Sequence, residues 1–114
     1  MSEKTLFQKI GDGEIPAQMV FEDESCFAFR DINPQAPTHI LVCPRKAIPG
    51  LDDITESDVE LIGHMFLVAK KIAKDEGLER GYRTVFNNGK HGQQTVPHLH
   101  LHILGGRQMT WPPG

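Results

Sequence analysis

Hydrophobic and polar residues alternate strictly over residues 98–103, in the order His-Leu-His-Leu-His-Ile, and the apolar Leu104 follows. A period of two is typical of a β-strand, because successive side chains of a strand point to opposite faces of the sheet. The pattern therefore predicts a strand over 98–104 with one imidazole face and one aliphatic face. The two faces are His98, His100 and His102 against Leu99, Leu101 and Ile103.

Apolar runs bounded by Gly, Pro and Asp predict four further strands, over 18–22, 25–30, 38–43 and 82–86. The first two are separated by only two or three residues, which favours an antiparallel pair around a tight turn. In the run 38–43, alternation places His39 on the face of Leu41 and Cys43, and Ile40 and Val42 on the other face.

Apolar residues three and four positions apart predict two helices. The short one covers about 3–10 with Ser2 as N-cap. The long one follows Thr55, whose capping-box partner is Asp58, and ends at Gly77. Together these elements predict an α+β fold, an antiparallel sheet of about five strands with the long helix on its apolar face.

The composition predicts a single domain over 1–114 and limits its partners. The net charge of -3 and the lack of a dense Lys/Arg run argue against nucleic acid or an anionic membrane as the main partner. The start lacks the apolar region of a signal peptide, and no apolar stretch is long enough to span a membrane. Cys26 and Cys43 do not form a C-x-x-C motif, so we expect reduced thiols in a cytoplasmic protein.

One chemical interpretation of the histidines is a metal site. An H-x-H pair on a strand with a third histidine from another strand, here His39, is a geometry that zinc enzymes use. No acidic residue lies in or near the histidine strand to orient the rings, and neither cysteine lies beside it in sequence. We therefore expect no metal, and a zinc-binding hydrolase stays as an alternative.

A second interpretation is nucleophilic attack at phosphorus. A neutral imidazole needs no separate base if its other nitrogen donates to an acceptor, such as a backbone carbonyl two residues away. His100, in the middle of the three, is the candidate nucleophile. Phosphoryl chemistry also needs donors around the phosphate oxygens, which Asn87, Gln94, Thr95 and the glycine-rich loop can supply.

The run His98–Leu104 fits the histidine-triad motif, and the chain resembles the histidine-triad nucleotide-binding (Hint) branch of the histidine triad (HIT) superfamily. The resemblance covers nearly the whole chain. The run 31–39 resembles the ribose-side and first-histidine segment of that branch, and 105–114 resembles its C-terminal ending. The Trp-Pro-Pro-Gly ending separates the branch from the dinucleoside-polyphosphate hydrolases of the same superfamily.

The resemblance implies a purine nucleoside phosphoramidase that needs no cofactor. His100 would attack the α-phosphorus, form a nucleotidyl-histidine and expel an amine, and water would then release the nucleoside monophosphate. His39, His98 and His102 would position groups or protonate them, and Asp31 would accept from the ribose hydroxyls. The remaining substrate contacts would be Asn87, Gln94 and Thr95 at the phosphate or leaving group, and Leu6, Phe7, Ile10, Phe29 and Ile32 around the base.

The resemblance also implies a homodimer whose sheets join, with Trp111 reaching toward the neighbour's active site. Three positions depart from the expected pattern: Pro97 precedes the histidine strand, Gln93 stands where a glycine is expected, and Thr95 replaces Ser. A third class also remains open, a nucleotide-binding or regulatory module without catalysis, because it would use the same pocket residues.

Overall fold

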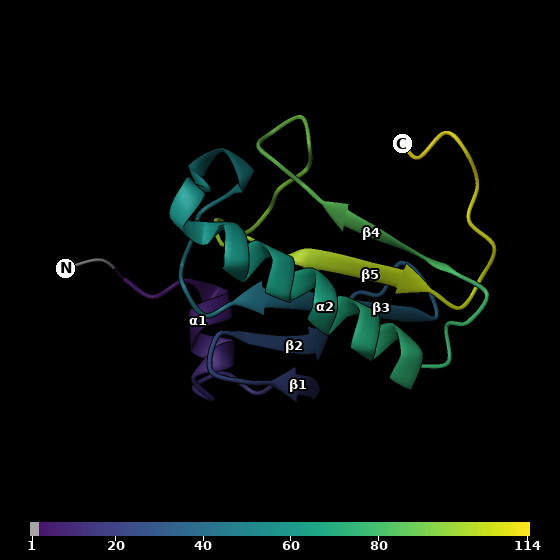
Figure 1. The fold of residues 1–114 in the computed structure, drawn as a ribbon, viewed down its shortest axis with the longest axis horizontal. Helices are drawn as coiled ribbons and strands as arrows, with labels where there is room; N and C mark the ends of the chain where they lie inside the picture. The colour runs from purple at the N-terminus through teal and green to yellow at the C-terminus, as the bar shows by residue number, and fades with distance from the viewer. Residues whose placement is uncertain (1–2) are drawn as a thin grey trace.

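The computed structural model describes residues 3–114 and forms one five-stranded antiparallel sheet (Figure 1). The strand order is β1-β2-β3-β5-β4, so the last strand in the chain lies between β3 and β4. This confirms the predicted α+β fold of five strands with one short and one long helix. The elements are α1 (Leu6–Gly11), β1 (Met19–Glu22), β2 (Cys26–Arg30), β3 (Thr38–Pro44), α2 (Val59–Asp75), β4 (Tyr82–Phe86) and β5 (Leu101–Gly105).

The two faces of the sheet carry different cores. In Figure 1, α2 runs across one face of the sheet. There Met65 of α2 packs in one cluster with Ile40 of β3 and Ile103 of β5, all fully buried. The opposite face carries α1, whose Phe7 belongs to a second cluster with Leu41. The predicted assignment of side chains to faces is therefore confirmed.

The histidine strand begins three residues later than predicted. Regular pairing with β3 and β4 starts at Leu101, not at His98. Pro44, at the end of β3, has no N–H to extend the ladder. The N–H of Leu99 instead donates to the carbonyl of Ile48 at 2.7 Å. The chain thus leaves the sheet while its side chains keep alternating between the faces.

A capping box precedes each helix. The Thr5 side chain caps α1 by accepting from the N–H of Gln8, and the predicted N-cap, Ser2, lies outside the described residues. The predicted box of Thr55 and Asp58 is present, but it first shapes a 3-10 turn over Glu56–Asp58, and α2 starts at Val59. Gly77 follows the C-cap residue of α2 with a φ of 74°, which agrees with the predicted helix end.

Cys26 and Cys43 are both free and buried, as expected for reduced thiols. They lie on neighbouring strands but belong to the cores on opposite faces of the sheet. Within residues 3–114, no helix is long and apolar enough to cross a membrane.

The loop between β4 and β5 holds one residue other than glycine in the left-handed backbone region. Gln93 has a φ of 62°, and Gly89 in the same loop has a φ of 68°. The left-handed conformation costs a residue with a Cβ roughly 1 kcal/mol, whereas glycine adopts it freely. Gln93 therefore occupies a glycine-type position, and it is the position at which the family resemblance leads one to expect a glycine.

We predict that Gln93→Gly raises the free energy of unfolding by about 0.5–1 kcal/mol, because relief of the backbone strain exceeds the added entropy of the unfolded chain. Chemical denaturation measures the change. The matched control is Gln108→Gly, a site without positive φ, where the same substitution should not stabilise the protein. A Gln93→Gly protein no more stable than wild type would contradict the prediction.

Candidate active site

A cavity of about 990 Å³ lies on the face of the sheet that carries α1. Apolar side chains of α1 and β2 line it, and three histidines and Asp31 line the same cavity. Ten of the residues that the sequence singles out meet there. They are Leu6, Phe7, Ile10, Phe29, Asp31, Ile32, His39, Thr95, His100 and His102.

His100 has a fixed tautomer. Its Nδ1 lies 2.7 Å from the carbonyl oxygen of His98. A carbonyl only accepts, so Nδ1 carries the proton and Nε2 keeps its lone pair. The acceptor is the carbonyl two residues back, as the sequence argument requires. The ring is held edge-on against Phe7, with 4.8 Å between the ring centroids.

His98 orients His100 through its backbone carbonyl, and it does not line the cavity. Its ring is fully buried, and Nε2–H donates to the carbonyl of Pro44 at 2.7 Å. Its Nδ1 accepts from the hydroxyl of Thr5 at 2.7 Å. These two bonds fix the residue whose carbonyl orients His100. Sequence reasoning missed Thr5, although the Thr-x-x-Gln spacing of its capping box is visible in the sequence.

His39 and His102 form a second hydrogen-bonded chain. The N–H of Gln35 donates to Nδ1 of His39 at 3.0 Å, so the proton of His39 resides on Nε2. That Nε2–H donates to Nδ1 of His102 at 2.9 Å. The remaining proton of neutral His102 therefore resides on its Nε2. His102 is thus a donor next to His100, at 5.0 Å between ring centroids.

The fold brings a carboxylate to these rings, which corrects one sequence argument. Asp31 lies outside the histidine strand in sequence, yet its Oδ2 is 3.5 Å from Nε2 of His39. Its Oδ1 accepts from the N–H of Asn33 at 2.8 Å. Asp31, His39 and His102 offer one ligand atom each within 4.8 Å of one another. Carboxylate oxygen and imidazole nitrogen are zinc ligands, so the donor set fits a zinc ion.

Three residues with predicted substrate contacts lie outside this cavity. The Asn87 amide donates to the carbonyl of Gly92 at 2.6 Å, and the Gln94 amide donates to the carbonyl of Pro49 at 2.6 Å. Both amides thus hold the loop between β4 and β5 in shape. Trp111 is 81 % exposed, and the guanidinium of Arg83 lies over its ring, 6.0 Å from the ring centroid. The substrate contacts of these three residues stay predictions.

Burial keeps the four histidines neutral. It lowers the pKa of His39, His98 and His100 below the usual histidine value, and nearby Asp31 opposes only part of that shift for His39 and His100. Burial, with added repulsion from His100 and His39, lowers the pKa of His102 to about 4. At neutral pH the rings therefore act as hydrogen-bond donors and acceptors rather than as cations.

We predict that stability falls as pH decreases from about 6.5 toward 4. The unfolded chain binds protons at these histidines near pH 6.5, whereas the folded chain binds them only at lower pH, so acid favours unfolding. The slope is at most about 1.4 kcal/mol per pH unit for each histidine. Denaturation at several pH values measures it. His102→Asn should reduce the slope, and His91→Asn, at an exposed loop position, should not; equal slopes would contradict the assignment.

Known proteins with similar sequences indicate the family of this chain. The HIT domain family matches residues 12–109. An uncharacterized HIT-like protein of Synechococcus elongatus is 56% identical over 114 residues, 100% of both chains. A 14 kDa zinc-binding protein of Zea mays is 55% identical over 112 residues, covering 96% of this chain and 88% of that one.

A solved structure of a HIT family protein has the same fold as this chain. The crystal structure of a HIT family hydrolase from Legionella pneumophila Philadelphia 1 superimposes with a TM-score of 0.95 at 57% identity, covering 97% of this chain and 100% of that one. The family match spans most of the chain, and the relatives align over nearly their full lengths. On this evidence the chain belongs to the HIT domain family.

Proposed function

We propose that the protein hydrolyses purine nucleoside 5′-phosphoramidates, as a member of the nucleotide-binding branch of the HIT superfamily. The observation that carries this proposal is the fixed tautomer of His100, whose Nδ1 donates to the carbonyl of His98 at 2.7 Å. That bond leaves Nε2 unprotonated on a ring that lines the cavity. A neutral, oriented imidazole is a nucleophile that needs no separate base.

The reaction has two displacements at phosphorus. Nε2 of His100 forms a bond to the α-phosphorus, the P–N bond breaks, and the leaving nitrogen takes a proton from solvent and departs as the amine. Water then attacks the phosphorus, the bond to His100 breaks, and the water proton passes to solvent. The Nε2–H of His102 and the hydroxyl of Thr95 donate to the phosphate oxygens, where positioning and charge stabilisation supply most of the catalysis.

The rest of the cavity suits a nucleoside. The side chains of Phe7, Ile10 and Phe29 offer an apolar, aromatic surface for a purine ring. Asp31 lines the same cavity beside His39, and its carboxylate accepts from the ribose hydroxyls. His39 and His98 act as positioning residues, because each holds another histidine rather than the substrate.

A homodimer is part of the proposal. Within residues 3–114, β4 is an edge strand that pairs with β5 alone, and an unpaired edge is a template for a second sheet. Helix α2 also exposes apolar side chains, because its Val59 and Leu67 are 66% and 65% exposed. The joined sheets would bring Trp111 toward the neighbour's cavity. Free thiols at both cysteines support a cytoplasmic location.

A zinc hydrolase is the second candidate. Asp31, His39 and His102 form a plausible donor set, and the relative from Zea mays carries the name zinc-binding protein. A bound zinc ion would act as a Lewis acid toward a phosphoryl oxygen. The ion would replace the hydrogen bond between His39 and His102 and leave His100 outside the donor set.

We predict that His100→Ala lowers turnover of adenosine 5′-phosphoramidate by at least about 10³-fold, because no other group replaces the nucleophile. Release of AMP and ammonia measures turnover. His64→Gln, on α2 and in contact with Asp23, should retain wild-type turnover. Undiminished turnover in His100→Ala would refute the nucleophile, and binding of AMP by a wild-type protein without turnover would favour a nucleotide-binding module.

Chelation separates the two candidate enzymes. We predict full phosphoramidase activity after exhaustive dialysis against a chelator, because nucleophilic attack by His100 requires no metal. Metal content is measured before and after dialysis. Loss of activity that added zinc restores would replace this mechanism with the zinc hydrolase.

We predict a dimer in solution, measured as mass by light scattering after size exclusion. Thr84→Pro in the middle of β4 should give a monomer, because proline removes a donor from the strand edge. Thr38→Pro, at the first residue of β3, tests whether a strand proline alone disturbs assembly and should leave the dimer intact. A monomeric wild-type protein would contradict the dimer.

A further inference from the structure

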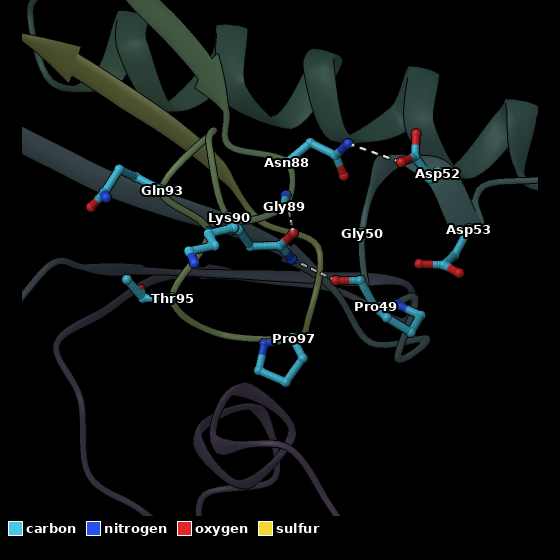
Figure 2. Close-up of a pocket in the computed structure, with 11 residues that line it drawn as sticks. Pro49, Gly50, Asp52, Asp53, Asn88, Gly89, Lys90, Gln93, Thr95 and Pro97 are labelled. Carbon is cyan, nitrogen blue, oxygen red and sulfur yellow. Dashed lines mark hydrogen bonds between the residues drawn. The ribbon is translucent and has the colours of Figure 1, made fainter.

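A second cavity of about 640 Å³ adjoins the histidine cavity. Two segments form it, residues 49–53 before α2 and residues 88–97 between β4 and β5. Thr95 lines both cavities, so they meet at the residue proposed to hold the phosphate. Figure 2 shows the second cavity between these two segments. A group bonded to the phosphate can therefore extend from one cavity into the other.

Hydrogen bonds within the chain fix the walls of this cavity. The Gln94 side chain joins the two segments, because it donates to the carbonyl of Pro49 at 2.6 Å and accepts from the N–H of Gly89 at 3.1 Å. The Asn88 amide donates to Asp52 at 3.1 Å. A Cβ at Gly50 would lie 3.1 Å from the Gln94 amide oxygen. These hydrogen bonds hold the two segments that form the cavity in fixed positions.

The charged groups of the cavity lie on opposite sides. Asp52 and Asp53 belong to the segment before α2, whereas Lys90 belongs to the same loop as Thr95. In Figure 2, Lys90 and Thr95 lie on one side and Asp53 on the other. A bound phosphate would meet the positive side, and the far side would attract a cation.

We propose that this second cavity binds the leaving amine of the substrate and selects amines that carry a second positive charge, such as diamines. The phosphate lies near Thr95 and Lys90, and the far cation of the amine pairs with Asp52 and Asp53. When the P–N bond breaks, the nitrogen takes a proton and the diamine departs through this cavity. This inference rests on the proposed phosphoramidase function.

Two adenosine 5′-phosphoramidates test the selection, one linked through nitrogen to 1,4-diaminobutane and the other to pentylamine, whose linked chain has a similar length but no second amino group. The measured quantity is the ratio of their kcat/KM values, diamine to pentylamine. We expect a ratio of about five or more at low salt, the size of one or two exposed ion pairs. Because salt screens exposed charges, the ratio should fall toward one near 1 M salt.

Charge-removing variants locate the effect. Asp52→Asn combined with Asp53→Asn should bring the ratio close to one. Lys90→Gln should lower both kcat/KM values together and keep the ratio, because both compounds carry the same phosphate. Glu24→Gln, at an exposed turn between β1 and β2, should change neither value.

The outcomes are separable. A wild-type ratio near one, or a ratio that survives the double Asp substitution, overturns the amine site even when both compounds are hydrolysed. If neither these compounds nor unsubstituted adenosine 5′-phosphoramidate is hydrolysed, the proposed function fails and the amine site fails with it.

Discussion

The site depends on a single hydrogen bond, from Nδ1 of His100 to the carbonyl of His98. In a regular ladder that carbonyl would accept from a neighbouring strand. Here the chain leaves the sheet before Leu101, which frees the carbonyl for the imidazole. Pro44 and Pro97 contribute to this exit because neither can donate to a ladder. The irregular backbone beside the sheet is therefore the feature that makes one histidine differ from its neighbours.

Alternation along β3 and β5 serves stability and chemistry at the same time. The aliphatic side chains face α2 and form the larger core, whereas the histidines face α1 and the cavity. His39 lies on β3 and His102 on β5, whereas His98 and His100 lie in the irregular segment just before β5. Burial of the rings on this face also lowers their pKa values, so they are neutral at neutral pH.

Helix α1 links the N-terminal part of the chain to the site. Thr5 caps this helix and also holds the ring of His98, and Phe7 packs against His100. A short helix is marginal alone, so its formation and the ordering of the histidines stabilise each other. The loop between β4 and β5 uses its polar side chains differently. Its amides bond to the loop's own backbone and, through Gln94, to the carbonyl of Pro49, and this shapes the second cavity rather than the first.

The sequence by itself determined the sheet, both helices, the assignment of side chains to faces and the three histidines, because periodicity and turn residues are local properties. It also determined the motif by which the family is recognised. The tertiary structure alone decided which groups meet. Asp31 reaches His39 and Thr5 reaches His98. Asn87 bonds within its own loop, and Gln94 bonds to Pro49. These contacts join segments distant in sequence or depend on the loop's path. It also decided that the ladder begins at Leu101 and not His98, since pairing depends on where the partner strands end.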